Sequence, residues 1–175
     1  MRHVNFFGWL AVFGVALAVV TTPARAEDPD FLVFSVGVHD VHDNKTTSEY
    51  RLEYRSDIEL SIFKPFTGFM FTGDKANYAY AGVYVDLFFG DRFVVQPSFA
   101  AGAYRQGDGK DLGNTLEFRS QFEFAYRRDD RSRIGISVNH ISNASLSQNN
   151  PGTESIVLTY AMPLSKIVGK NLWRD

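Results

Sequence analysis

The stretch NTLEFRSQFEFAYR, residues 114–127, has a period of two. Apolar side chains occupy one parity, which is interrupted only by Ser120, and charged or amide side chains occupy the other. The apolar set is Leu116, Phe118, Phe122, Phe124 and Tyr126, and the polar set is Glu117, Arg119, Gln121, Glu123 and Arg127. Because successive side chains of a strand point to opposite faces, this pattern predicts a β-strand with one apolar and one charged face.

The same alternation recurs along the chain and predicts eight strands. Two of them, 63–72 and 77–89, follow it less regularly, and Pro97 lies inside the fifth, where it removes a ladder hydrogen bond. The expected ranges are 30–41, 47–60, 63–72, 77–89, 92–105, 114–127, 131–142 and 154–164. Most are long enough to cross a bilayer as tilted strands, which takes about 9–11 residues. An even number of strands with mostly shorter joints at one end predicts an all-β fold, an eight-stranded antiparallel transmembrane β-barrel.

A soluble barrel of the lipocalin type, with its apolar face inward, is the alternative. Two features favour the inverted arrangement. The lumen of an eight-stranded barrel is filled by side chains, and the charged faces alternate in sign, as neutralising pairs in a closed interior would (Glu49, Arg51, Glu53 and Arg55, for example). The opposite face is rich in Phe, Tyr and Leu, which suits contact with lipid.

The N-terminus predicts export. Basic residues precede an apolar run from Phe6 to Val20, and Ala24-Arg25-Ala26 resembles a cleavage site, so we expect a signal peptide over 1–26 and a barrel domain over 27–175. A membrane anchor would need about 20 unbroken apolar residues. The chain has 18 Lys and Arg against 20 Asp and Glu and no Cys, so it offers no basic surface for nucleic acid and no disulfide. The sequence contains no cluster of His or Cys that would predict a metal site.

The stretch NHISNASLSQNNPGTES, residues 139–155, carries the candidate chemistry. His140 and Ser142 continue the outward parity of one strand, and Glu154 begins the outward parity of the next. Ser142 could act as a nucleophile, His140 as its base, and Glu154 as the acid that orients the imidazole. Asn143 or Asn150 could donate to an oxyanion, as could a loop N–H. The alternative is an ordinary polar loop, since Ser, Asn and Pro-Gly are common in turns.

The joint pattern His140-Ile-Ser142-Asn143-Ala144, then Asn150-Pro-Gly152-Thr-Glu154-Ser and a strand ending in Met162-Pro163, resembles the PagL family of outer-membrane lipid A 3-O-deacylases. The resemblance implies an esterase site on the outside of the barrel that removes the 3-hydroxyacyl chain at position 3 of lipid A. It implies Ser142 as nucleophile, His140 as base, Glu154 as orienting acid, Asn150 in the oxyanion hole and Asn143 as a residue that shapes the site. It also implies a place in the bacterial outer membrane, with the site at the extracellular leaflet and lipopolysaccharide as substrate, and no metal or cofactor.

Two other functions use the same barrel and stay open at this point. One is a non-enzymatic adhesin or structural barrel, and the other is an outer-membrane acyltransferase, which would need an internal cavity for an acyl chain. The segment SKIVGKNLWRD, residues 165–175, departs from the aromatic last residue with which many outer-membrane barrels end. The sequence leaves the oligomeric state open, a homodimer included.

Overall fold

The computed structural model describes residues 28–42 and 46–168. The predicted signal peptide over 1–26 lies outside these residues, as does most of the C-terminal segment. None of the described helices is long and apolar enough to span a membrane.

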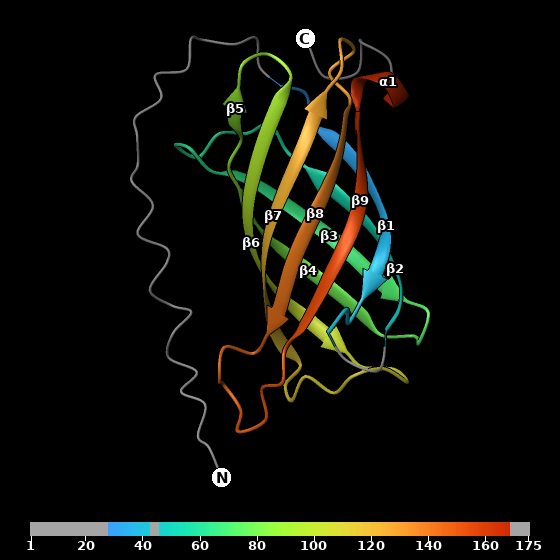
Figure 1. The fold of residues 1–175 in the computed structure, drawn as a ribbon. Coiled ribbons are helices and arrows are strands. Elements are labelled where there is room, and N and C mark those ends of the chain that lie inside the picture. The colour runs from blue at the N-terminus through green and yellow to red at the C-terminus, as the bar shows by residue number, and fades with distance from the viewer. Residues whose placement is uncertain (1–27, 43–45, 169–175) are drawn as a thin grey trace.

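Nine strands form one closed antiparallel sheet (Figure 1). The sheet order is β4-β3-β2-β1-β9-β8-β7-β6-β5, and pairing of β4 with β6 closes the barrel. A four-residue helix, α1 (Ser165–Val168), follows the last strand. The strands are β1 (Phe31–His39), β2 (Thr47–Arg55), β3 (Lys64–Thr72), β4 (Asn77–Tyr84), β5 (Leu87–Phe89), β6 (Phe93–Arg105), β7 (Leu116–Arg127), β8 (Arg133–Ser142) and β9 (Thr153–Pro163).

The wall has eight strand positions, because β4 and β5 follow one another along the same edge of β6. The predicted eight-stranded antiparallel barrel is therefore confirmed. The expected single strand over 77–89 is interrupted at residues 85–86. Asp86 is drawn away from the wall there by polar partners that lie far along the chain, accepting hydrogen bonds from Arg133 (2.8 Å) and Gln96 (2.7 Å).

This interruption accommodates Pro97 of β6. The Pro97 carbonyl accepts a hydrogen bond from Val85 N–H at 3.1 Å. In an antiparallel strand the N–H and C=O of one residue point to the same side, so the N–H that proline lacks would also face residues 85–86. The missing donor therefore falls where the ladder is already broken.

The second strand ends earlier than expected, at Arg55 rather than at residue 60. Beyond Arg55 the backbone N–H groups donate to side chains and not to a neighbouring strand. Ile58 N–H donates to Ser56 Oγ, and Asp57 N–H donates to Asp30 Oδ1. Ser61 has a φ of 67°, which turns the chain. The joint between β2 and β3 therefore spans 56–63 and is not the short connection that the sequence suggested.

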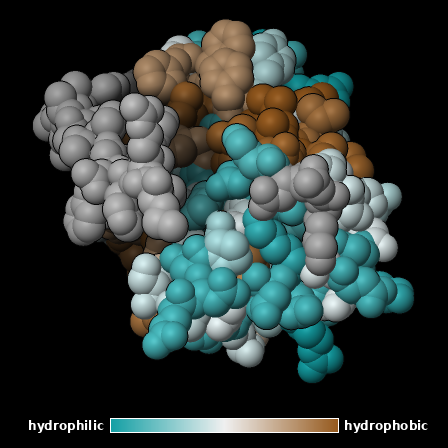
Figure 2. Space-filling view, turned by 60° about the horizontal axis from the view of Figure 1, so that its bottom comes forward, coloured by the Kyte–Doolittle hydropathy of each residue, from teal (hydrophilic) through white to brown (hydrophobic). Residues whose placement is uncertain are grey.

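We call the end of the barrel at which β1 leads into β2, and which carries the loops 73–76, 106–115 and 143–152, the loop end, and the other the turn end (Figure 1). Seen toward the loop end, hydrophilic residues cover that end and hydrophobic residues gather on the adjoining wall (Figure 2). The outward positions of the strands are apolar and exposed, for example Phe122, Phe124, Ile136 and Leu158. An apolar belt between polar ends is the arrangement of a transmembrane barrel.

Charged side chains fill much of the interior, as the alternation of signs predicted. Arg55 contacts both Glu53 and Glu123 at 2.8 Å, and Arg119 contacts Glu53 at the same distance. All four side chains are buried. Glu117 is different, because neither of its buried carboxylate oxygens has a hydrogen-bond partner among the described residues.

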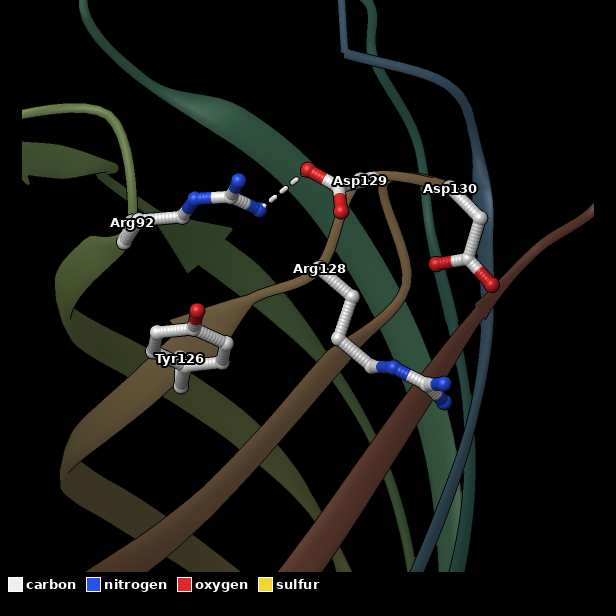
Figure 3. A pocket seen from close by; sticks show the side chains of 5 residues that line it. All are labelled: Arg92, Tyr126, Arg128, Asp129 and Asp130. Carbon is white, nitrogen blue, oxygen red and sulfur yellow. Dashed lines mark ion pairs between the residues drawn. The ribbon is translucent and has the colours of Figure 1, made fainter.

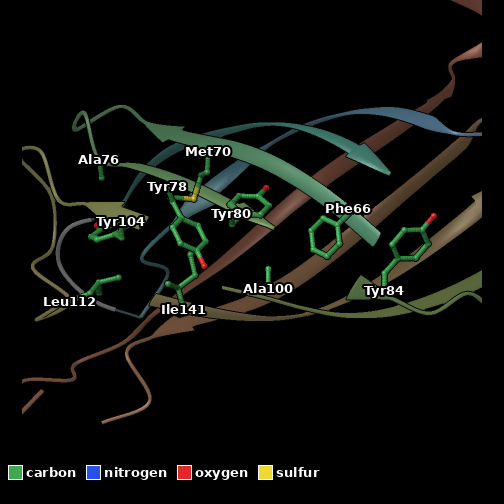
Figure 4. Packing of buried hydrophobic residues seen from close by; sticks show 10 residues of the cluster. All are labelled: Phe66, Met70, Ala76, Tyr78, Tyr80, Tyr84, Ala100, Tyr104, Leu112 and Ile141. Atoms are coloured by element: carbon green, nitrogen blue, oxygen red, sulfur yellow. The ribbon is translucent and has the colours of Figure 1, made fainter. Parts of the chain in front are cut away.

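The interior of β3 and β4 is aromatic instead of charged, which explains their irregular sequence pattern. Their inward residues pack with residues of neighbouring strands and loops in one cluster (Figure 4). The ring centroids of Tyr78 and Tyr80 are 4.9 Å apart, and the Tyr80 hydroxyl donates to Glu53 at 2.8 Å, so the aromatic and charged parts of the interior are joined. The cluster comprises Phe66, Met70, Ala76, Tyr78, Tyr80, Tyr84, Ala100, Tyr104, Leu112 and Ile141.

Candidate functional site

A hollow of about 350 Å³ lies at the turn end (Figure 3). Arg92 pairs with Asp129 across it at 2.5 Å, and Tyr126, Arg128 and Asp130 complete its lining. None of the residues predicted to form a site lies at this end of the barrel. The hollow is polar and ionic, and its charges neutralise one another.

The predicted residues meet at the loop end, where β8 runs into loop 143–152 and the chain returns in β9. His140 and Glu154 are directly opposite in the ladder between β8 and β9. His140 Nδ1 lies 2.9 Å from Glu154 Oε1, a hydrogen-bonding distance. Both side chains are on the outer surface, 49% and 38% exposed. The carboxylate therefore accepts from Nδ1–H and leaves Nε2 as the nitrogen that can accept a proton.

Ser142 is two residues beyond His140 on the same outward face of β8 and is half-buried. Next-but-one residues on a strand are about 6.5–7 Å apart at the backbone, a gap that the two side chains can share. Among the residues that the structure describes, the Ser142 hydroxyl has no hydrogen-bond partner. The structure therefore brings Ser142, His140 and Glu154 to one patch, with the His140–Glu154 contact formed.

Gly152 supports the imidazole from the loop side. A Cβ atom at this position would lie 2.7 Å from His140 Cε1 and 3.3 Å from Nε2. Its φ of 65° is also one that side-chain-bearing residues rarely adopt. Glycine is thus required here for two reasons, and the Pro151-Gly152 pair is the only hint of this in the sequence.

The loop between the strands is held by Asn143 and Asn150. The Asn143 amide Nδ2 is buried and donates to the carbonyls of Leu112 and Asn149, both at 2.8 Å. Asn150 Oδ1 accepts from the Asn143 backbone N–H at 3.0 Å, which leaves the Asn150 NH2 group as a donor for a ligand. The structure therefore gives Asn143 a role inside the loop and Asn150 a position from which it can meet a substrate.

A second imidazole, which the sequence does not mark as part of the site, lies beside the His140–Glu154 pair. His42 Nδ1 is 3.7 Å from Glu154 Oε2, and His42 is exposed in loop 40–46. The adjacent Val41 N–H donates to the Glu154 carbonyl at 3.1 Å and continues the ladder between β1 and β9. No group of three or more His, Cys, Asp or Glu suited to a metal ion occurs within residues 28–42 and 46–168.

An exposed imidazole held by a carboxylate, with a hydroxyl two residues away and an amide donor in the adjoining loop, has the parts needed for acyl transfer to serine. Its surroundings are unusual for such chemistry. The patch faces outward, next to the apolar belt, so its substrate would approach from the lipid side of the wall.

The family model described as Lipid A 3-O-deacylase (PagL) matches residues 49–163 of the chain. The chain is 28% identical to the lipid A deacylase PagL of Pseudomonas aeruginosa over 177 residues, covering 89% of this chain and 96% of that protein. It is 27% identical to the lipid A deacylase PagL of Bordetella bronchiseptica over 73 residues, 41% of each chain.

Two solved structures are similar to the barrel. One is the crystal structure of the outer membrane enzyme PagL, with a TM-score of 0.61, 21% identity and coverage of 76% of this chain and 99% of that one. The other comes from the de novo design of transmembrane β-barrels, with a TM-score of 0.54, 13% identity and coverage of 79% and 100%. At these identities, both establish the fold.

Proposed function

The chain belongs to the PagL family of lipid A 3-O-deacylases, and from that premise we propose that it is an outer-membrane serine esterase. The reaction is hydrolysis of the ester that holds the 3-hydroxyacyl chain at position 3 of lipid A. The observation that carries the proposal is the 2.9 Å contact between His140 and Glu154 on the lipid-facing side, next to Ser142. An ester carried by a membrane lipid can reach a nucleophile on that side of the wall without entering the barrel.

In the proposed mechanism, His140 Nε2 removes the proton of Ser142 while Oγ attacks the ester carbonyl. Glu154 keeps the second nitrogen protonated and stabilises the imidazolium that forms. The tetrahedral intermediate then collapses: the acyl C–O bond breaks, and His140 returns its proton to the sugar oxygen. A water molecule, activated by the same imidazole, hydrolyses the acyl-serine and releases a 3-hydroxy fatty acid.

Asn150 is the proposed oxyanion donor. Its Oδ1 is engaged by the Asn143 N–H, so its NH2 group is the part that can donate to the developing negative charge. Asn143, which is buried and donates to three loop acceptors, holds the loop that presents Asn150. Asn150 thus binds the oxyanion, and Asn143 supports the loop.

The proposed orientation has the turn end in the periplasm and the loop end at the cell surface. β1 begins at the turn end and β9 ends there (Figure 1). An even number of strand crossings requires this arrangement. The site near the loop end then meets the outer leaflet, where lipopolysaccharide resides.

An acyltransferase is less well supported, because such an enzyme needs room for an acyl chain inside the barrel. The interior between β2, β4 and β7 is occupied by Glu53, Tyr80 and Arg119, whose guanidinium carbon lies 4.1 Å from the Tyr80 ring centroid. The accessible surface next to Ser142, the candidate nucleophile, is on the outside of the barrel.

The direct test is mass spectrometry of lipid A incubated with protein purified in detergent from the full chain, beside the Ser142→Ala variant. We expect the parent to remove one 3-hydroxyacyl chain and the folded variant to remove none. If neither protein changes lipid A while both are folded, the esterase proposal fails and a non-enzymatic barrel replaces it.

A further inference from the structure

The joint between β2 and β3 at the turn end carries a surface of large apolar side chains. We call residues 58–63, with the sequence IELSIF, the apolar hairpin. Its exposed apolar side chains are Ile58 (60%), Leu60 (59%), Ile62 (58%) and Phe63 (44%). Outward residues of the transmembrane strands are exposed to the same degree, for example Leu158 at 61%. A continuous apolar surface of this kind indicates contact with an apolar partner.

The apolar hairpin is held in place at its tip and at its base. At the tip, Leu60 and Phe63 exchange backbone hydrogen bonds of 2.7 and 3.2 Å. At the base, the Ser56 N–H donates to the Pro65 carbonyl at 3.0 Å, and the Ser56 carbonyl accepts from the Tyr84 hydroxyl at 2.8 Å. The exposure of the apolar side chains is therefore a property of a folded hairpin and not of a loose loop.

The charged residue of the apolar hairpin is bound to the end of the barrel. Glu59 contacts Lys64 at 3.7 Å, and Lys64 contacts Asp86 at 3.8 Å. Just before the hairpin, the Asp57 N–H donates to Asp30 Oδ1 at 2.8 Å. Polar contacts thus join the hairpin to the turn end, while the apolar residues that alternate with Glu59 along the chain stay uncovered.

The apolar hairpin lies beside the outer wall of the barrel. The segment between β2 and β3 projects sideways from the wall (Figure 1). Phe63 borders a shallow hollow together with Val83 and Phe99, which lie on the outer face of β4 and β6. Leu87 and Phe89 of the adjoining β5 are exposed as well. The surface of the hairpin is therefore continuous with the apolar belt, which faces lipid.

We propose that the apolar hairpin is an interfacial anchor, whose apolar side chains bind the acyl chains of phospholipids in the leaflet at the turn end. An element with one apolar and one charged side lies in the plane of the interface, with the apolar side about 5–10 Å into the boundary between head groups and acyl chains. The side chains enter hydrocarbon, whereas the irregular backbone and Glu59 stay at the level of the head groups. The inference rests on the transmembrane barrel and not on the proposed reaction, so the two can fail separately.

The test uses nitroxide labels, because the chain has no Cys and a single introduced Cys takes the label at a known place. Ile62→Cys reports on the apolar side of the hairpin, and Glu59→Cys, in the same hairpin, is the matched control. The labelled proteins, purified from the full chain, are reconstituted in vesicles of phosphatidylethanolamine and phosphatidylglycerol. Electron paramagnetic resonance then measures how often each nitroxide collides with oxygen, which dissolves in lipid, and with a water-soluble nickel complex.

At position 62 we expect more collisions with oxygen than with the nickel complex, as for a label at Phe124→Cys in the apolar belt, and at position 59 we expect the reverse. The heat-modifiable band on gels checks folding, and Leu60→Cys replaces Ile62→Cys if that variant does not fold. Equal access of the nickel complex to both positions would place the hairpin in water and overturn the proposal. If neither reagent reaches position 62, a second copy of the chain or another protein covers the surface, which also overturns it.

Discussion

The barrel contains two groups made of one His, one Glu and one Ser, and they lie on opposite faces of the same wall. In the inner group, His39 Nδ1 lies 2.9 Å from Glu49 and 3.0 Å from Ser155. In the outer group, His140 Nδ1 lies 2.9 Å from Glu154, with Ser142 two residues away. The inner His and Glu are 1% and 0% exposed, whereas the outer ones are 49% and 38% exposed.

Residue types and distances therefore do not make an esterase site by themselves. Glu154 and Ser155 are consecutive on β9, so one points outward and the other inward. The inner Ser155 donates to Glu49 at 2.6 Å, which ties its hydroxyl to a carboxylate in a closed interior. Only the outer group can meet a lipid, so substitutions in the outer group should lower turnover and substitutions in the inner group should lower stability.

His140→Asn should have the largest effect. Loss of the general base is expected to lower kcat/KM by about 10⁴-fold or more, as in other serine hydrolases. Because the residue is on the outside, the barrel should stay folded, which the heat-modifiable band on gels checks. Turnover within tenfold of the parent would remove His140 from the mechanism.

Glu154→Gln should lower kcat by about 10³-fold, since an amide can favour the wrong imidazole tautomer. Substrate binding should change little. Steady-state rates on lipid A measure kcat and KM of the Glu154→Gln variant. His42→Gln, on the other side of the carboxylate, is the matched variant. If His42→Gln costs more than Glu154→Gln, the orienting role belongs to a different pair.

Asn150→Asp should lower kcat by about 10²-fold, the usual cost of one oxyanion donor. The substitution keeps an oxygen that can accept from the Asn143 N–H, so the loop should remain in place, and it replaces the NH2 donor by a carboxylate oxygen that also repels the oxyanion. The rate of acyl-enzyme formation in a rapid-mixing experiment reports the step concerned. An unchanged rate would assign the oxyanion to other donors.

Glu49→Gln addresses the inner group and should leave turnover within a factor of about two. Its effect should be on folding, because the buried carboxylate contacts both His39 and Arg51. Loss of one member of a buried ion pair costs about 3 kcal/mol, which urea unfolding in detergent can measure. A large loss of turnover with unchanged stability would erase the contrast between the two groups.

Lys75→Gln should have the smallest effect, because the Lys75–Asp108 pair is fully exposed in the loops. Lys75 lowers the pKa of Asp108, so the pair stabilises the fold at neutral pH and stops doing so as the pH falls through that lowered pKa. The variant and the parent should therefore differ slightly in stability at pH 7, and this difference should shrink as the pH falls below 3.8, the ordinary pKa of the Asp108 carboxyl. A difference that grows on acidification would contradict this sign.

The strand pattern and the direction of the site were predictable, because a period of two is local information. In β7 and β8 most apolar side chains face outward and most polar ones face inward, with Ala125 and Ile141 as buried apolar exceptions on the inward face. The break at residues 85–86 was not predictable, because Asp86 leaves the wall to reach Arg133, 47 positions away. The aromatic interior of β3 and β4 also hid the alternation, since Tyr78 and Tyr80 read as outward residues.

Some residues of the candidate site could likewise be predicted from the sequence, and others could not. Ser142, His140 and Glu154 share one short stretch and one parity, so the sequence could group them. His42 and Gly152 act through contacts that form only when the loops meet, and nothing local marks them. The inner group went unnoticed because His39 and Ser155 are 116 positions apart.

The central claim is that the serine on the outer face is the nucleophile. We would treat the purified protein with an alkyl fluorophosphonate, which phosphonylates activated serines, and locate the adduct by peptide mass spectrometry. We expect one adduct, on Ser142, and none in the His140→Asn variant. An adduct on Ser155, or a folded and deacylating protein without an adduct on Ser142, would contradict it.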